Sequence, residues 1–446
     1  MAQPKNNNSR IIGIRGEDKN KWEKRTPLVP DAISELRVVH NIHCVVQPCP
    51  IRIFPDKEYA EAGAEISDDL SRCKVIFAVK EIPKELLKPG KTYVFFSHTI
   101  KGQVSNIPML KRLMELGCTL IDYEKITDAE GKRLIFFGRY AGLAGMVDTL
   151  WALGRRLAWE RIRSPFLQVK HAFGYDSLVQ AKEAFTRIGE EIQKHGLPEL
   201  LTPFICGFVG YGNVSGGAQE IFDLLPVEEI APSDLHAFID KKKYSRKKVY
   251  KVIFKEEDLF TPSDPAAPFD LDDYYHHPEK YRSRFGQYVP CLTLIINAVY
   301  WDNRYPRLIT KEYLKNLFTE KVRPRLRIIG DISCDVEGAV ECTVRTTTPD
   351  APVYVYNPLT GETIDGAGGK GVVVMAVDNL PCEFPRESSL DFSKHLKPFI
   401  PAMVQADYTV DFLKCTLPEP VKKAVIVYKG KLTPDYTYMN DFLKGV

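Results

Sequence analysis

The stretch Phe204-Ile-Cys-Gly-Phe-Val-Gly-Tyr-Gly-Asn-Val-Ser-Gly-Gly-Ala-Gln219 joins an apolar run to a glycine-rich turn, and an apolar segment follows at residues 221–225. The run predicts a buried strand and the segment predicts a helix. Between them, Gly210 permits a tight turn, Gly212 lets the backbone approach a pyrophosphate, and the helix N-terminus offers N–H groups to an anion. The stretch therefore predicts a dinucleotide site in an α/β domain. Because Ser215 replaces the third glycine of the usual pattern, a purely structural turn is the alternative.

The choice between NAD and NADP depends on the residue that ends the second strand of such a domain. In NAD-binding domains an Asp or Glu there hydrogen-bonds the ribose 2′-hydroxyl. The second strand expected here, residues 227–230, is followed by Ala-Pro-Ser, and a basic run occupies residues 241–248. Lys247 and Lys248 of that run could accept a 2′-phosphate, so the sequence favours NADP(H). A solvated charge run is the alternative for each lysine.

Strands and helices alternate along the chain on both sides of the glycine-rich stretch. Apolar β-type runs alternate with helical segments through residues 11–96, which predicts an α/β domain with a largely parallel sheet. Apolar residues at helical spacing predict a long helix over residues 141–161, which we expect to bridge two domains. An irregular but ordered insertion is expected at residues 256–288, and helix returns near residues 392–404. The length of 446 residues suits two domains, each with its own core.

The composition excludes several classes of protein. With 44% hydrophobic and 27% charged residues and no run of eighteen apolar residues, the chain is neither disordered nor membrane-spanning. A net charge of +3 gives no general argument for nucleic acid or an anionic membrane as partner. The ten cysteines contain no CxxC pair, so we expect reduced core residues, and no metal site is expected. Residues 1–8 show no leader, which predicts a cytoplasmic location, or a mitochondrial one if a leader has been removed.

Two basic side chains follow apolar runs in the amino-terminal part. Lys80 follows the run at residues 75–79, and His98 comes after the run that begins at residue 93. A cation at the carboxyl end of a buried parallel strand is poorly placed for structure alone, but it is well placed for a ligand in the crevice there. These positions are therefore candidates for a substrate site. A partly exposed side chain at a strand end is the alternative for each.

Several blocks spread over nearly the whole chain resemble the lysine–2-oxoglutarate reductase domain of the saccharopine pathway. The blocks are residues 15–30, Val79-Lys-Glu, Phe95-Phe-Ser-His98-Thr, Ile121-Asp-Tyr-Glu124-Lys, Phe137-Gly-x-x-Ala-Gly-x-Ala-Gly145, Gly210-x-Gly-Asn-Val-Ser-x-Gly217, His277-Pro-Glu-x-Tyr-x-Ser-x-Phe285, Asp331-Ile-Ser-x-Asp335 and Asp378-Asn-Leu-Pro381. More distantly, the layout is similar to lysine-forming saccharopine dehydrogenase, alanine dehydrogenase and the nucleotide-binding subunit of transhydrogenase.

The resemblance implies an α/β fold of the alanine dehydrogenase type, with two Rossmann-like domains flanking a central cleft. Residues 1–140 together with 383–446 would form the substrate domain, and residues 141–382 the NADP-binding domain. The residues expected to contact the cofactor are Gly210, Gly212, Asn213, Val214, Ser215, Lys247, Lys248, Asn297, Asp331, Asp335, Asn379 and Leu380.

The resemblance also implies a reaction of lysine degradation. Lysine and 2-oxoglutarate would condense at the ε-amino group, and NADPH would reduce the imine to saccharopine. Beyond these small molecules, a homo-oligomer and a fused or separate saccharopine dehydrogenase are the partners that the resemblance allows. Because this domain is commonly fused to the second enzyme and this chain stops at Val446, we expect a free-standing reductase or a domain cut from a longer protein.

Carried over by position, Lys80 and His98 form the acid/base pair, while Glu81 and Glu124 tune or orient it. The reaction itself also requires acid/base groups. The amine must lose a proton, and the carbinolamine hydroxyl must gain one to leave as water.

Arginine is the residue best suited to the substrate carboxylates, because its planar fork matches a carboxylate. The resemblance favours Arg25, with Arg15 and Arg133 as further candidates, for which a surface ion pair is the alternative. Two other functions remain open at this point. One is an NAD-linked, lysine-forming saccharopine dehydrogenase, and the other is a non-catalytic nucleotide-binding subunit of the transhydrogenase type.

Overall fold

The computed structural model describes residues 10–320 and 324–444. The first nine residues, on which the expectation about a leader rests, lie outside this range. The chain divides into two compact units, residues 1–137 with 385–446 and residues 138–384. From the sequence alone, the boundaries were expected after residues 140 and 382.

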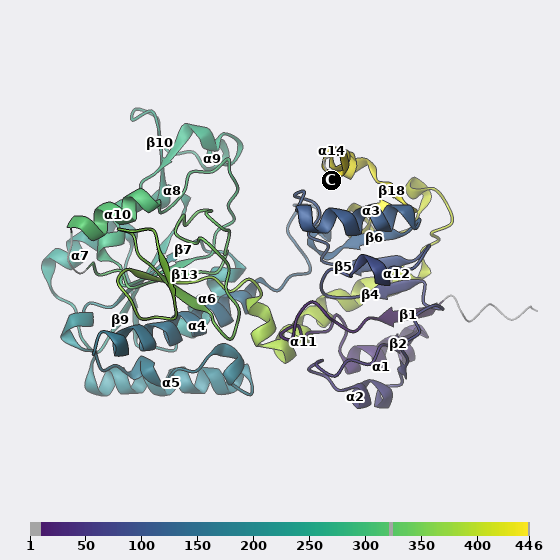
Figure 1. The fold of residues 1–446 in the computed structure, drawn as a ribbon, viewed down its shortest axis with the longest axis horizontal. Helices are drawn as coiled ribbons and strands as arrows, with labels where there is room; N and C mark the ends of the chain where they lie inside the picture. The colour runs from purple at the N-terminus through teal and green to yellow at the C-terminus, as the bar shows by residue number, and fades with distance from the viewer. Residues whose placement is uncertain (1–9, 321–323, 445–446) are drawn as a thin grey trace, which may run out of the picture. The chain divides into compact units, whose positions relative to one another are not determined.

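The first unit is built on an eight-stranded sheet with strand order β18-β17-β6-β5-β4-β1-β2-β3 (Figure 1). Its six amino-terminal strands are parallel, and the carboxy-terminal segment adds β17 antiparallel to β6 and β18 antiparallel to β17. The strands are β1 (Ile11–Ile14), β2 (His43–Val46), β3 (Glu65–Ile66), β4 (Val75–Phe77), β5 (Thr92–Phe95), β6 (Thr119–Asp122), β17 (Val425–Tyr428) and β18 (Lys431–Leu432). The helices are α1 (Pro30–His40), α2 (Asp56–Glu61), α3 (Ile107–Glu115), α11 (Pro385–Leu396), α12 (Ile400–Gln405), α13 (Glu419–Lys423) and α14 (Asn440–Lys444).

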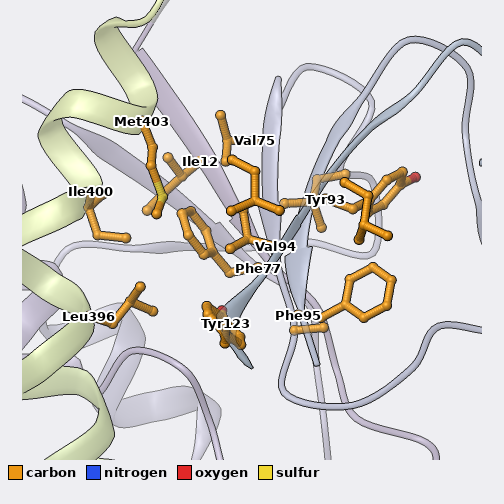
Figure 2. Close-up of a cluster of buried hydrophobic side chains, with 14 of the residues drawn as sticks. Ile12, Val75, Phe77, Tyr93, Val94, Phe95, Tyr123, Leu396, Ile400 and Met403 are labelled. Carbon is orange, nitrogen blue, oxygen red and sulfur yellow. The ribbon is translucent and has the colours of Figure 1, made fainter. Parts of the chain in front are cut away.

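The carboxy-terminal segment completes the core of this unit. Figure 2 shows Leu396, Ile400 and Met403 facing the sheet residues Ile12 and Phe77. All five side chains belong to one hydrophobic cluster and are fully buried. Burial of this kind stabilises by about 1.5–3 kcal/mol for each large apolar side chain. The resemblance implied this completion by a helical region, whereas the strand β17 was not predicted.

The second unit contains an eight-stranded sheet with order β15-β14-β16-β13-β12-β7-β9-β8 and a separate antiparallel pair, β10 and β11. The strands are β7 (Ile205–Val209), β8 (Val227–Glu229), β9 (Val249–Phe254), β10 (Phe260–Pro262), β11 (Tyr281–Ser283), β12 (Leu294–Asn297), β13 (Ile328–Asp331), β14 (Val353–Tyr356), β15 (Thr363–Asp365) and β16 (Val372–Met375). The helices are α4 (Gly138–Trp159), α5 (Leu178–His195), α6 (Asn213–Phe222), α7 (Leu235–Lys241), α8 (Glu256–Leu259), α9 (Leu271–His276) and α10 (Lys311–Glu320). The predicted strand and turn are present as β7 and the glycine turn, but the helix begins earlier than expected: α6 starts at Asn213, inside the glycine-rich stretch, and ends at Phe222, whereas helix was expected at residues 221–225.

Helices α4 and α6 pack unusually closely, and two glycines make this contact. A Cβ atom on Gly142 would lie 1.9 Å from the Val214 carbonyl oxygen, and one on Gly217 would lie 2.1 Å from the Arg139 carbonyl oxygen. No side chain fits at either position. Helix α4, which the apolar spacing predicted, thus holds the helix of the glycine turn by direct backbone contact.

One topological expectation was wrong. The strand beside β7 is β9, which pairs with it in parallel from Ile205 opposite Tyr250 to Val209 opposite Phe254. Strand β8, which the sequence analysis took as the second strand of the nucleotide fold, is at the sheet edge beyond β9. The position that contacts the ribose in such a fold therefore follows Phe254 rather than β8.

The ten cysteines are free thiols, and nine of them are buried, which agrees with the expected reduced core residues. Within the described residues, no group of three or more His, Cys, Asp or Glu side chains is arranged to hold a metal ion. None of the described helices is long and apolar enough to cross a membrane.

Candidate functional site

Lys80 and His98 follow two neighbouring strands of the first unit. Strands β4 and β5 are parallel, and their ladder continues through a hydrogen bond from the Phe96 N–H to the Val79 carbonyl, 3.1 Å long. Both basic residues come just after this ladder, at the same edge of the sheet, and both are half-buried. Within the described part of the chain, no hydrogen bond or ion pair engages the Lys80 ammonium.

His98 is paired with Glu81, one of the two glutamates that the resemblance gave as tuning or orienting the acid/base pair. Its Nδ1 lies 2.7 Å from Oε1 of Glu81, and Asn106 donates to both residues, to the His98 carbonyl at 3.2 Å and to Glu81 at 3.4 Å. Burial alone would raise the pKa of Glu81, but the hydrogen bond and charge of His98 outweigh it and lower this pKa to about 2. Glu81 therefore stays ionised, fixes the imidazole orientation and leaves Nε2 for proton transfer.

The backbone conformation of His98 is a second indication that this residue belongs to a functional site. Its φ is +47°, a left-handed conformation that non-glycine residues seldom adopt. Such conformations persist only where the surroundings hold them, and they cluster at functional sites.

Glu17 is a site residue that the sequence analysis missed. Its carboxylate accepts hydrogen bonds from the backbone N–H groups of Val79, at 2.6 Å, and Lys80, at 3.1 Å. Burial, with a smaller effect of the Glu23 charge, raises the pKa of Glu17 to about 7. Glu17 is thus a buried carboxyl that holds the turn bearing Lys80. Since this contact spans more than sixty residues, no local sequence pattern indicates it.

The Arg25 side chain is buried, and its guanidinium is already engaged by neighbouring residues. Its Nε and Nη2 donate to Glu23 at 2.8 and 2.6 Å, and its guanidinium lies 4.2 Å from the centre of the Phe137 ring. Only 2% of the residue is exposed. The planar fork is therefore bonded to Glu23, and a role for Arg25 in holding a substrate carboxylate stays a prediction.

The other two arginines differ from Arg25 and from each other. Arg15 is buried and paired with Asp18 through Nη2, while its Nη1 is buried without a hydrogen-bond partner. An unpaired buried donor of this kind suits an incoming carboxylate. Arg133 is half exposed and forms an ion pair with Glu124, whose backbone N–H is bonded to Asp122 at 2.8 Å. Both remain candidates.

In the second unit, the glycine turn has the geometry that an anion site requires. Gly210 has a φ of +94°, which favours glycine, and Gly212 is the N-cap of α6, with no atom within 4 Å of the place of a Cβ. Asn213 is the first residue of the helix and is exposed. The start of α6 is therefore open around Gly212 and Asn213, and the first-turn N–H groups of a helix have no partner within the helix and can bind a phosphate.

Two further predicted cofactor residues form a buried polar pair at the ends of β12 and β13. The Asn297 amide donates to Asp331 at 2.8 Å, and Asp331 also accepts from Thr343. Burial raises the pKa of Asp331 to about 6, against the lowering effect of these hydrogen bonds. Oδ1 of Asn297 is buried without a partner, so the pair offers an acceptor that a bound group could satisfy.

Several other residues that were predicted to contact the cofactor are buried or pack against the core of the second unit. Ser215 is fully buried and accepts a hydrogen bond from Gln219 at 3.1 Å, while Val214 and Leu380 pack in the core of this unit. Asn379 precedes the short helical turn that contains Leu380. For these positions, as for Asp335, which is half-buried, contact with a cofactor stays a prediction.

Lys247 and Lys248 are wrongly placed for a 2′-phosphate. They precede β9, and β9 runs parallel to β7, so they lie at the amino edge of the sheet, whereas the glycine turn follows the carboxyl end of β7. The length of β9 alone separates the two edges by about 17 Å. Lys248 instead forms an ion pair with Glu228. The sequence misled because a linear run of basic residues does not show at which end of the strand it lies.

A cavity of about 290 Å³ opens beside the glycine turn. Its lining includes Gly210, Gly212 and Glu256, together with several aromatic side chains. Glu256 comes two residues after Phe254, at the carboxyl end of β9. A carboxylate therefore does follow the strand beside β7, whereas Ala-Pro-Ser follows the segment at residues 227–230.

Comparison with known proteins identifies the family. Residues 13–144 match the model of the alanine dehydrogenase/PNT N-terminal domain, and residues 238–435 match that of the C-terminal domain. The two matches together cover well over half of the chain. The chain belongs to the alanine dehydrogenase/PNT family. Membership of this family implies a nicotinamide nucleotide cofactor, and the glycine turn, the open N-terminus of α6 and the unpaired Asn297 oxygen fit such a group.

Solved structures show the same fold. An L-alanine dehydrogenase has a TM-score of 0.61 at 18% identity, with 97% of this chain and 99% of that chain covered. A transhydrogenase from Sinorhizobium meliloti has a TM-score of 0.53 at 14% identity, covering 95% of this chain and all of the other. The predicted α/β fold of the alanine dehydrogenase type is therefore confirmed.

The curated relatives include proteins of two names. Alpha-aminoadipic semialdehyde synthase of Arabidopsis thaliana is 40% identical over 96% of this chain, and the mitochondrial protein of that name from Bos taurus is 34% identical over 96%. This chain spans 41% and 47% of their respective lengths. A saccharopine dehydrogenase [NAD(+), L-lysine-forming] of Neurospora crassa is 26% identical, with 92% of this chain and 98% of the relative covered.

Proposed function

We propose that this chain is an oxidoreductase of lysine degradation, which condenses the ε-amino group of L-lysine with 2-oxoglutarate and reduces the imine to saccharopine. The observation that carries the proposal is the placement of Lys80 beside the His98–Glu81 pair at the ends of two adjacent parallel strands. The 40% identity to an alpha-aminoadipic semialdehyde synthase and the 26% identity to a lysine-forming saccharopine dehydrogenase support it.

The chemistry needs two proton transfers before reduction. The lysine amine attacks the keto carbon after losing a proton, and the resulting carbinolamine loses its hydroxyl as water once that hydroxyl is protonated. His98, held by ionised Glu81, can exchange a proton through Nε2, and Lys80 is the second group of the pair. The nicotinamide nucleotide supplies the hydride that reduces the imine carbon.

The substrates bring three carboxylates to this site. Arg15, with its unpaired buried Nη1, and half-exposed Arg133 are the side chains available to bind them. Glu17 acts as a positioning residue, since it bonds the backbone at Lys80 without reaching the reacting atoms.

The sequence favoured NADPH for two reasons, the basic run at Lys247 and Lys248 and the absence of a carboxylate after the second strand, and the structure supports neither reason. Lys247 and Lys248 lie at the wrong edge of the sheet, and a carboxylate, Glu256, does follow the strand next to β7. This observation favours a second candidate function, a lysine-forming saccharopine dehydrogenase linked to NAD, which runs the same conversion in reverse.

A steady-state assay with substituted acid/base residues tests the proposed function. Lys80→Met and His98→Gln should each lower the lysine-dependent oxidation of the reduced nucleotide by about 10²- to 10⁴-fold. Lys84→Met and His43→Gln, which change exposed residues of the same types, serve as matched controls and should leave the rate unchanged.

If Lys80 and His98 act as a unit, the double substitution should cost much less than the product of the two single effects. A rate within about threefold of the parent for both single variants would contradict an acid/base role, since the expected loss is far larger. Nucleotide affinity should hardly change in either variant.

A further inference from the structure

The left-handed backbone at His98 is held by the residues on either side of it. Ser97 and Thr99 are both fully buried, and their hydroxyl oxygens lie 2.8 Å apart, so a hydrogen bond joins them across His98. The His98 carbonyl is held as well, since it accepts from the Asn106 amide at 3.2 Å. A buried polar contact therefore closes the chain around the residue whose conformation is unfavourable in isolation.

This contact is anchored by Asp122, a side chain to which the sequence analysis gave no role. Asp122 is the last residue of β6, lies opposite Phe95 of β5 and is fully buried. Its Oδ2 accepts from the Ser97 N–H at 3.0 Å and also from the Ser97 hydroxyl. Because the second bond uses the only hydroxyl proton of Ser97, the Thr99 hydroxyl must donate to Ser97. A chain of donors thus runs from Thr99 through Ser97 to Asp122.

The same carboxyl group also holds the segment that carries Glu124. Its Oδ1 accepts from the Glu124 N–H at 2.8 Å, and the Glu124 side chain forms an ion pair with Arg133. Burial raises the pKa of Asp122, while the hydrogen bonds from Ser97 and Glu124 lower it. Within the described part of the chain, every hydrogen bond of Asp122 is one that its carboxyl oxygens accept. One side chain therefore joins two segments of the candidate acid/base site.

We propose that Asp122 is a positioning residue of this site: through Ser97 and Thr99 it holds His98 in the left-handed conformation that keeps Nδ1 on Glu81 and leaves Nε2 for proton transfer. Asp122 acts through the backbone and not on the reacting atoms. The effect on rate rests on the proposed function, whereas the orientation of the imidazole does not depend on which substrates bind.

Asp122→Asn tests the proposal by kinetics, because it keeps the shape of the side chain and removes one acceptor oxygen. An amide has a single oxygen, so it cannot accept from both Ser97 and Glu124 as the carboxyl group does. Misplacement of a catalytic group by about 1 Å can cost about 10²-fold in rate, so kcat with lysine and 2-oxoglutarate should fall by about that factor. The KM values of both substrates should change little. Thermal unfolding of the full chain shows whether the variant is folded.

Thr99→Val provides a milder test if Asp122→Asn is unstable, since it removes one hydroxyl group with almost no change of shape. The loss of this hydrogen bond should lower kcat by about fivefold, the effect of a typical net contribution of about 1 kcal/mol. Thr99→Ser keeps the hydroxyl and should restore the parent rate. Thr92→Val is the matched control, because Thr92 is also a buried threonine but stands at the start of β5, and it should leave kcat unchanged.

The nitrogen NMR spectrum of the histidine rings tests the orientation of His98 without turnover. The full chain is labelled with ¹⁵N-histidine, and the signals of His98 are identified by their absence in His98→Gln. In the neutral ring of the parent, Nδ1 should carry the proton, because the ionised Glu81 can only accept from it. Asp122→Asn and Thr99→Val should instead show a mixture of the two tautomers.

Ring spectra that stay unchanged in both folded variants would overturn the proposal. Equal losses of kcat in Thr99→Val and Thr92→Val would also overturn it, since the effect would then come from the removal of any buried hydroxyl in this region. The expected ring spectra without lysine-dependent turnover in the parent protein would uphold the positioning of His98 and contradict only the proposed function.

Discussion

Replacing Gly212 by alanine separates nucleotide binding from folding. Gly212 is the N-cap of α6 with a φ of −78°, which alanine tolerates, and its Cβ would meet no atom within 4 Å. The fold should therefore lose no more than about 1 kcal/mol, the difference between glycine and alanine as N-cap. The same methyl group would stand where the backbone approaches the pyrophosphate, so nucleotide affinity should fall at least about tenfold, or roughly 1.4 kcal/mol.

Gly216→Ala provides the matched control for this experiment. Gly216 lies one turn further along α6, and its Cβ would also point into open space. Alanine should stabilise the helix there by up to about 1 kcal/mol. Fluorescence titration with reduced nucleotide measures affinity, and thermal unfolding measures stability. Unchanged affinity in Gly212→Ala would place the phosphates elsewhere and refute this reasoning.

Three further predictions follow from the second unit. Gly142→Ala should destabilise by about 2 kcal/mol or more, since its methyl would overlap a backbone oxygen 1.9 Å away; an unchanged unfolding temperature would contradict the close packing of α4 and α6. Burial and the charge of Asp148 raise the folded-state pKa of Glu383, so the free energy of unfolding should decrease as pH rises above the unfolded value near 4.5. Glu383→Gln should then be more stable than the parent at pH 8 but not at pH 4, and parallel pH profiles of the unfolding temperature would exclude this effect. Lys247→Gln and Lys248→Gln should leave the affinity for both nucleotides unchanged in titrations, because these lysines lie at the amino edge of the sheet; a selective loss of NADPH binding would restore them to the site.

Much of the local structure could be predicted because local patterns encode it. The long helix expected at residues 141–161 is α4 (Gly138–Trp159), and the expected strand before the glycine turn is β7 (Ile205–Val209). Apolar periodicity and turn chemistry determine both, with little help from distant residues.

Strand order could not be predicted in the same way. The segment at residues 227–230 does form a strand, but it lies at the edge, and β9 takes the place beside β7. Sequence order suggests neighbours only as a tendency, since sequential strands often pair but are not required to. This difference moved the position at which such a fold binds the ribose from the end of β8 to the end of β9. Lys247 and Lys248 are misplaced for a separate reason, because they precede β9 and lie at the amino edge of the sheet.

Polar contacts between residues far apart in the sequence could not be predicted either. The resemblance implied only that Glu81 and Glu124 tune or orient the acid/base pair, and neither the contact of Glu81 with His98 nor the support of Lys80 by Glu17 was specified. Hydrogen bonds between a side chain and a distant backbone leave no periodic signal, so only a three-dimensional structure shows them.

Product analysis with both proposed substrates tests the central claim most directly. The protein is incubated with reduced nicotinamide nucleotide, L-lysine and 2-oxoglutarate, and nucleotide oxidation is compared with the product identified by mass spectrometry. We expect oxidation that requires both substrates, with one molecule of saccharopine formed for each nucleotide oxidised. Oxidation that proceeds instead with ammonia and pyruvate, or no oxidation with lysine and 2-oxoglutarate under either nucleotide, would contradict the proposed function.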